Sequence, residues 1–224
     1  MSEKLVDEIV ALEWKAFDEV KNEGGRAGCQ DDWNTFQIMR KSQYLTWTDE
    51  MLQQYKADFI DSGERGWNMV TEKYARMMES NAKEQYEAIK DQLPPISDEK
   101  KQLIEIVVAI QVKWMEDFRR EYPHLGMNGR ALRTEQDTEY ATSYETYLRG
   151  EISTYSDKML CLYALYIMKL YNEGKNLAKV IMMLTTAFYG YASIDAAENR
   201  LKYSQAAKII ADKYLQGIGW NKLE

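Results

Sequence analysis

Residues 98–120 read DEKKQLIEIVVAIQVKWMEDFRR and carry the clearest helical pattern in the chain. Large apolar side chains recur there every three or four residues, which places them on one face of an α-helix. Ser97, directly before the stretch, is a favourable N-cap, and Asp98 and Glu99 put negative charge at the positive end of the helix dipole. The pattern therefore predicts an amphipathic helix. Its apolar face consists of Leu103, Val107, Ile110, Trp114 and Phe118.

The same periodicity extends through most of the chain. Residues 3–21 form a second amphipathic stretch, with Ser2 as its N-cap and Gly24-Gly25 as a stop signal. The chain has three prolines, and no stretch shows the strict alternation that is typical of strands. These features predict an all-α fold, a helical bundle. Further helical stretches are expected at 35–62, 67–90, 143–172, 176–190 and 194–216.

Composition and charge limit the classes of protein that this chain can represent. Its 224 residues are 45% hydrophobic and 29% charged, so we expect one soluble globular domain over 1–224. Cys29 and Cys161 are too few for a disulfide scaffold, and the N-terminus lacks a signal-peptide pattern. No apolar run reaches the roughly 20 residues of a membrane span, so we expect a cytoplasmic protein that does not enter membranes. A net charge of −7 argues against nucleic-acid binding through a basic surface.

Two parts of the chain resemble each other. Residues 35–69 align without a gap on residues 143–177, an offset of 143 − 35 = 108. The alignment predicts half-repeats of roughly three helices each, at about 3–93 and 97–205, with a C-terminal helix at 201–216. The alternative is that two amphipathic helices merely have similar caps. The seven identities among 35 aligned positions are Thr46/Thr154, Asp49/Asp157, Met51/Met159, Leu52/Leu160, Tyr55/Tyr163, Gly66/Gly174 and Asn68/Asn176.

A Gly-Arg-Ala sequence precedes the aligned region in both halves, at 25–27 and at 129–131. If the halves stack face to face, joined by Leu93-Pro94-Pro95-Ile96, both loops approach a common cleft, because ligand sites of helical folds often lie between facing helices. Arg26 and Arg130 would then clamp an anion, since a guanidinium offers a planar fork to a carboxylate or phosphate.

The first of these loops also holds a cysteine. Cys29, beside Arg26 at a helix start, could be activated as a nucleophile by the adjacent positive charge. No general base accompanies it, because the only histidine, His124, follows a proline in a different loop. We favour the interpretation that Arg26 pairs with Asp31 or Asp32 and that Cys29 is a small buried apolar residue.

Two helical segments carry further polar candidates. Glu145 and Arg149 are an i,i+4 pair with the acid first, the favourable order on a helix, while Tyr144, Tyr147 and Glu151 fall along another face. A segment this aromatic and polar either lines a site or forms a buried polar network that fixes the packing. The second segment holds the i,i+4 pair Glu72/Arg76.

These residues predict a polar cleft between the halves that binds a small, anionic ligand. Enzymatic acid–base chemistry is left open, with Glu145, Glu151 and Asp32 as candidate catalytic residues, because carboxylates beside aromatics and arginines can be tuned to either protonation state. The predicted ligand-binding residues are Arg26, Cys29, Gln30, Arg40, Gln43, Glu72, Arg76, Arg130, Tyr144 and Arg149, and the predicted aromatic walls are Trp33, Trp47, Tyr144 and Tyr155.

No cofactor or metal is predicted. Helical di-iron proteins use Glu-x-x-His pairs, and the chain has none. A divalent metal held by Asp31, Asp32, Glu145 or Glu151 is a lesser alternative. Phosphate-loop, dinucleotide and Ser-His-Asp motifs are absent from the sequence.

The alternative function is a non-enzymatic interaction module whose polar motifs are structural. Its docking face would be the C-terminal segment 201–220, although we favour a last helix that packs on the core. A homodimer is compatible with either function. The apolar residues of this segment are Tyr203, Ile209, Ile210, Tyr214, Leu215 and Trp220.

The motifs together resemble a bacterial family described as domain of unknown function 4125. The resemblance covers roughly residues 5–200. It implies a stand-alone or modular cytoplasmic domain of bacteria and carries over no activity. The matching stretches are Gly24-Gly25-Arg26-Ala27-Gly28-Cys29-Gln30-Asp31-Asp32 with Phe36 and Met39-Arg40-Lys41-Ser42-Gln43, then Glu72-Lys73-Tyr74-Ala75-Arg76-Met77-Met78, then Thr142 to Ser156.

Overall fold

The computed structural model describes residues 3–22 and 25–217, with side chains up to residue 213. Within these residues the chain forms eleven α-helices and no strand, which confirms the all-α prediction. The same residues include no helix that is both long and apolar enough to cross a membrane.

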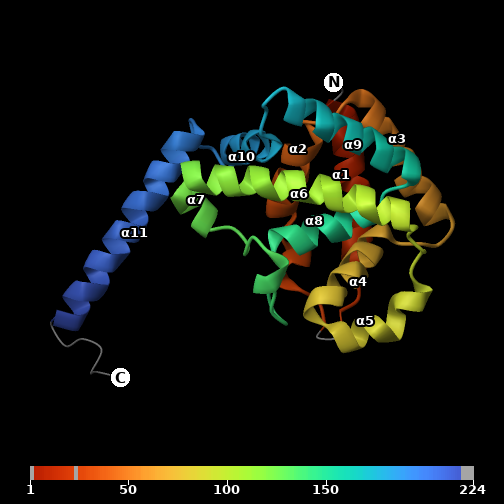
Figure 1. Cartoon of the computed structure of the whole chain (residues 1–224). Coiled ribbons are helices and arrows are strands. Elements are labelled where there is room, and N and C mark those ends of the chain that lie inside the picture. Colours follow the sequence, from red (N-terminus) through yellow and green to blue (C-terminus); the bar gives the residue numbers. More distant parts are fainter. Residues whose placement is uncertain (1–2, 23–24, 218–224) are drawn as a thin grey trace.

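The helices follow one another in two similar series (Figure 1). The first series consists of α1 (Glu3–Asp18), α2 (Trp33–Tyr44), α3 (Asp49–Glu64) and α4 (Met69–Asn81), followed by the short α5 (Lys83–Ile89). The second consists of α6 (Asp98–Glu121), α8 (Tyr144–Ser153), α9 (Asp157–Asn172) and α10 (Leu177–Phe188). The remaining elements are α7 (Pro123–Met127), α11 (Ile194–Gly217) and the 3-10 turns η1 (Gly28–Asp31), η2 (Lys90–Gln92) and η3 (Thr134–Gln136).

Three of the predicted helices are each a pair of helices. The stretch 67–90 is divided at Ala82 into α4 and α5. The stretch 35–62 is divided at Thr48, whose Oγ1 accepts a hydrogen bond from the Met51 amide at 3.2 Å and so starts α3. Ser156 divides the stretch 143–172 in the same way. A side-chain cap satisfies amides that a helix start leaves unpaired, so it favours a new start even within a continuous apolar pattern. Each half therefore has four helices of ten or more residues rather than about three.

The core lies where the two series face each other. α3 packs against α9, and the aromatic side chains around this contact form one buried cluster. The Trp47 and Tyr55 rings meet edge-on with centroids 5.5 Å apart, and the Tyr155 and Tyr163 rings do the same at 5.6 Å. Such edge-to-face pairs are favourable beyond the apolar area that they bury. The cluster fixes how the two series meet.

Corresponding helices of the two series have corresponding contacts. α9 begins and ends 108 residues after α3, and α4 packs on α8 just as α10 packs on α2. Asn68 Nδ2 donates to the Ala16 carbonyl at 2.8 Å, and Asn176 Nδ2 donates to the Trp114 carbonyl at 2.8 Å. Reciprocal contacts of this kind are what a two-fold arrangement produces. They fit the predicted halves, while the duplication itself stays a prediction.

The two Gly-Arg-Ala sequences do not lie at equivalent places in these halves. Gln30 Oε1 accepts a hydrogen bond from the Ala27 amide in η1, and Gln136 Oε1 accepts one from the Arg133 amide in η3, each at 2.9 Å. These matching turns are 136 − 30 = 106 residues apart, whereas the Gly-Arg-Ala sequences are 104 apart. The sequence match is therefore shifted by two residues from the structural one.

The C-terminal helix was expected to pack on the core, but most of it does not. α11 is anchored at its start, where Ile194 and Ala197 are buried, and contacts α7 and α10. It then runs away from the helical body (Figure 1), and residues 206–213 are exposed. The side chains of Tyr214 and Leu215, and all of Trp220, lie outside the described residues.

Candidate functional site

The predicted site residues occupy three separate places. Arg40, Gln43 and Glu151 lie in the core, and Arg26, Gln30 and Asp32 lie in or beside the first loop. Arg76, Glu145 and Arg149 line a groove between the two series. The structure therefore does not bring them into one cleft, and each place needs its own explanation.

Arg40 is the centre of the core group. Its Nε and Nη2 atoms contact the two carboxylate oxygens of Glu13 at 2.7 and 2.6 Å, which is a bidentate pair. Its Nη1 contacts Glu151 at 2.9 Å on the other side. All three side chains are buried. A guanidinium between two carboxylates satisfies the charges of α1, α2 and α8 at once, since its planar fork matches carboxylate geometry.

Polar neighbours complete this group, which we call the core network. The hydroxyls of Tyr44 and Tyr55 donate to Glu13 Oε1 at 2.6 and 2.7 Å. Gln43 Nε2 donates to Glu151 at 2.8 Å, and Lys73 Nζ lies 3.2 Å from the same carboxylate. A buried network of this kind stabilises a fold only when its members are satisfied, as these are. None of its members lines the groove.

The electrostatics of Glu151 predict an acid-sensitive stability. Burial alone would raise the pKa of Glu151, but the charges of Arg40 and Lys73 and the hydrogen bond from Gln43 outweigh it and hold the pKa well below its usual range. A carboxyl with a lowered pKa stabilises the fold above its unfolded-state pKa, and this contribution is lost as the pH falls.

We therefore expect the free energy of unfolding to decrease as the pH drops below about 4, and to decrease less steeply in Glu151→Gln. Denaturant unfolding at a series of pH values measures both slopes. Equal slopes in the two proteins would show that Glu151 is not held ionised by the core network.

The second series replaces part of the network by neutral groups. Tyr163 donates to Gln111 Oε1 at 2.9 Å, where the first series has Tyr55 and Glu13. The position equivalent to Arg40 (offset 108) is Leu148, which packs in the hydrophobic core. The same helix arrangement thus forms without the charges, which favours a structural role for the Glu13–Arg40 pair.

The first loop is held together by its own charges. Arg26 pairs with Asp18 at 2.6 Å and with Asp31 at 2.8 Å. The pair with Asp31 is one of the two that the sequence predicted. Buried Gln30 donates to two carbonyls at the end of α1. Asp32 caps α2 by accepting from the Thr35 amide, and this hydrogen bond lowers the pKa of Asp32. Cys29 is exposed, so the expectation of a buried cysteine is wrong.

The remaining predicted residues do not form a site either. The Arg130 guanidinium covers the Tyr147 ring, 4.8 Å from its centroid. Tyr144 packs against the core, and burial raises the pKa of its hydroxyl. The predicted walls Trp47 and Tyr155 are buried in the aromatic cluster, while Trp33 lies on the surface against Trp14. Neither Arg26 nor Arg130 lines the groove.

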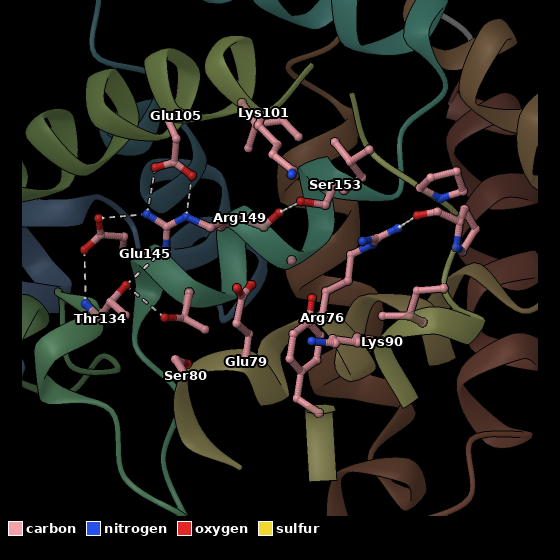
Figure 2. Close-up of a pocket in the computed structure, with 18 of the residues that line it drawn as sticks. Arg76, Glu79, Ser80, Lys90, Lys101, Glu105, Thr134, Glu145, Arg149 and Ser153 are labelled. Atoms are coloured by element: carbon pink, nitrogen blue, oxygen red, sulfur yellow. Dashed lines mark hydrogen bonds and ion pairs between the residues drawn. The ribbon is translucent and has the colours of Figure 1, made fainter. Parts of the chain in front are cut away.

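The groove between the series has a volume of about 1200 Å³. One wall is α4 and the other is α6 with α8, while α5 and the strap (residues 93–96) close one end. Figure 2 shows the polar side chains of both walls directed into it. The side chains drawn from these walls include Arg76, Glu79 and Ser80 on α4, Lys101 and Glu105 on α6, and Glu145, Arg149 and Ser153 on α8.

Arg149 organises the second wall. Its Nε and Nη2 contact Glu105 at 2.7 and 2.9 Å, and Nη2 also lies 3.2 Å from Glu145. The other oxygen of Glu145 accepts from the Thr134 amide at 3.0 Å. On the first wall, Arg76 pairs with buried Glu72 and donates to the Pro94 carbonyl at 2.7 Å. These contacts tie the strap and η3 to the helices and fix the groove's shape.

The groove's charges are unevenly satisfied. Its unpaired groups are carboxylates, because Glu79, Asp91 and Glu135 make no ion pair within the described residues. Such a lining favours a ligand that carries positive charge. Each of its four cations is paired: Arg76 with Glu72, Lys90 with Glu87, Lys101 with Asp98 and Arg149 with Glu105.

A much smaller groove lies at the equivalent place between α2 and α10. Its volume is about 140 Å³. Lys41 pairs with Asp7 there at 2.7 Å, as Arg149 pairs with Glu105 in the large groove. The ion pair is therefore common to both halves, and the size and polar lining distinguish the large groove. The small groove is lined by Glu3, Val6, Asp7, Lys41, Leu45 and Phe188.

A comparison with protein families identifies the relationship of the chain. The family described as "Protein of unknown function (DUF4125)" matches residues 3–199. The chain belongs to DUF4125. The resemblance seen in the sequence is thereby confirmed. Comparison with curated proteins and with solved structures gives no significant match.

The DUF4125 match and the packing of the chain end at nearly the same place. The match includes both series of helices and stops at residue 199. The exposed part of α11 begins soon afterwards. The family therefore corresponds to the helical body that forms the core network and the groove.

Several residues of this DUF4125 body were not predicted from the sequence as site residues. Glu13 and Lys73 belong to the core network, and a signal for Glu13 was present, because it follows Ile9 by four residues on an apolar helix face. Among the groove residues, Glu79 had a signal, because it follows the Glu72/Arg76 pair at the next turn of the helix. Glu105 and Glu135 gave none, since exposed glutamates are common. No group of three or more His, Cys, Asp or Glu within the residues described is placed to hold a metal ion.

Proposed function

We propose that this DUF4125 protein binds a small polar molecule in the groove between α4 and α8, and that the molecule carries at least one ammonium group. The observation that supports this proposal most strongly is the difference between the two equivalent grooves. The same helices and the same ion pair form both, yet one holds about 1200 Å³ and the other about 140 Å³. The larger groove has α5, the strap and η3 as additional walls, and these segments surround it with polar side chains that the small groove lacks.

The unpaired carboxylates support the positive charge of the ligand. Glu79, Asp91 and Glu135 lie on three different segments around the groove, so one ligand can meet them from several directions. The sequence suggested an anionic ligand clamped by Arg26 and Arg130, but neither of them lines the groove. The arginines that do line it, Arg76 and Arg149, are engaged by Glu72 and Glu105. An anion would have to displace one of these acids.

Native mass spectrometry of protein purified from its own host tests the proposal. We expect a bound small molecule in the wild-type protein and at least a tenfold weaker retention in Glu79→Gln/Glu135→Gln, since each lost ion pair with a ligand changes affinity by about 1 kcal/mol or more. The matched control is Glu50→Gln/Glu64→Gln, which removes two exposed, unpaired carboxylates from α3. Equal retention in both double variants would contradict a ligand in this groove.

A further inference from the structure

The outer face of α10 is apolar and uncovered. Its sequence, LAKVIMMLTTAF, contains one charged residue, Lys179. Leu177 and Ala178 are buried in the core, whereas Val180 and Met183 on the other side are 43% and 49% exposed. A helix that is apolar all round is normally covered all round. Some surface is therefore missing from this side of the single chain.

The projecting part of α11 is uncovered as well. Tyr203 and Ile210 lie seven residues apart, on one side of the helix, and are 72% and 69% exposed. An isolated helical segment of about 12–15 residues is only marginally stable in water, so most helices depend on packing of an apolar face. This part of α11 lacks such packing within the chain (Figure 1).

The first half of the molecule shows what covers the equivalent surface. The groove between α4 and α8 is closed by the segment that directly follows α4, namely α5 and the strap. In the second half, the segment that directly follows α10 is α11, and it turns away instead of closing the groove between α2 and α10. The covering segment is thus present in the chain but lies elsewhere.

We propose that α11 covers the α10 face of a second copy of this chain, and that the second copy returns its own α11 to the first. The contact is self-complementary, so a two-fold axis relates the copies and the dimer is closed. Charge fits this exchange, because the exposed residues within 202–213 of α11 include three lysines and one aspartate. The rim of the small groove carries Glu3 beside the Asp7–Lys41 pair. The proposal is independent of the ligand, which would occupy the other groove.

Sedimentation equilibrium of the full chain tests the oligomeric state. We expect a species of twice the 26.2 kDa chain mass at micromolar concentration. Met183→Asp on α10 and Ile210→Asp on α11 should each shift the protein to monomer, raising the dissociation constant at least 100-fold. Leu165→Asp is the matched control, because Leu165 is an exposed apolar residue on α9, outside the proposed contact. Circular dichroism verifies that each variant is folded.

Mixing the two variants distinguishes exchange from any other dimer. Each variant alone has two damaged contacts, whereas a heterodimer of Met183→Asp with Ile210→Asp has one contact with both changes and one that is entirely native. We therefore expect the mixture to recover dimer. A wild-type protein that remains monomeric up to roughly 100 µM, a dimer that survives both substitutions, or a mixture that stays monomeric would each overturn the proposal.

Discussion

Replacing Arg40 by leucine is expected to lower the free energy of unfolding by about 3–5 kcal/mol. The substitution removes the cation that contacts both Glu13 and Glu151 in the core network. Lys73 still faces Glu151, but Glu13 keeps only the hydroxyls of Tyr44 and Tyr55. A buried carboxylate without a counter-ion costs far more than the net value of the pair, because its desolvation is no longer offset.

The second series supplies the control for this prediction. Glu13→Gln/Arg40→Leu recreates the Gln111 and Leu148 combination of the other half, in which the tyrosine hydroxyl donates to a neutral amide. We expect the double variant to be more stable than Arg40→Leu alone, by at least about 1 kcal/mol, since it removes the stranded charge. Urea unfolding monitored by circular dichroism measures both values. The single variant Glu13→Gln is measured as well. A double variant whose loss equals the sum of the losses in Arg40→Leu and Glu13→Gln would contradict a coupled pair.

Gly150→Ala is expected to cost about 1–3 kcal/mol of stability, the usual range for overpacking. A Cβ on Gly150 would lie 2.9 Å from Met77 Cγ and 3.0 Å from the Lys73 carbonyl oxygen. Met77 can move, but the carbonyl belongs to the backbone of α4. The methyl group therefore forces α4 and α8 apart, although alanine is the better helix former.

Gly63→Ala is the matched control for this substitution. Gly63 lies in α3, and a Cβ there would meet nothing within 4 Å. The same chemical change should stabilise the protein by about 0.5–1 kcal/mol, because it removes only the conformational freedom of glycine. Thermal or urea unfolding compares the two. If both variants are stabilised alike, the close contact between α4 and α8 is not a constraint on the fold.

The helices could be predicted from the sequence because their apolar periodicity is local. The stretch at 98–120 is one helix, α6, with Ser97 as its cap. The breaks within 35–62 and 143–172 were not predicted, because the apolar pattern continues across Thr48 and Ser156. The side chains of these two residues nevertheless cap the start of a new helix. The path of α11 could not be predicted, because an amphipathic pattern does not specify whether the helix packs on its own chain or on another one.

The predicted site failed to assemble for a reason that helix geometry makes clear. Glu145 and Arg149 lie on one face of α8, while Glu151 lies on another, and α8 separates the groove from the core. Residues six apart on a helix point in different directions, so Glu145 and Glu151 cannot serve one cleft. The groove itself depends on α5, the strap and η3, whose approach is set by contacts between distant segments, such as Arg76 with the Pro94 carbonyl.

An amide NMR titration of the isotope-labelled protein tests most directly whether the groove is the binding site. Spermidine is the cationic probe, citrate is the anionic one, and physiological ionic strength screens non-specific attraction. We predict saturable shifts from spermidine at groove residues such as Ser80, Glu135 and Ser153, and their loss in Glu79→Gln/Glu135→Gln. Shifts that follow citrate instead, or that spread over the acidic surface without saturating, would contradict the account.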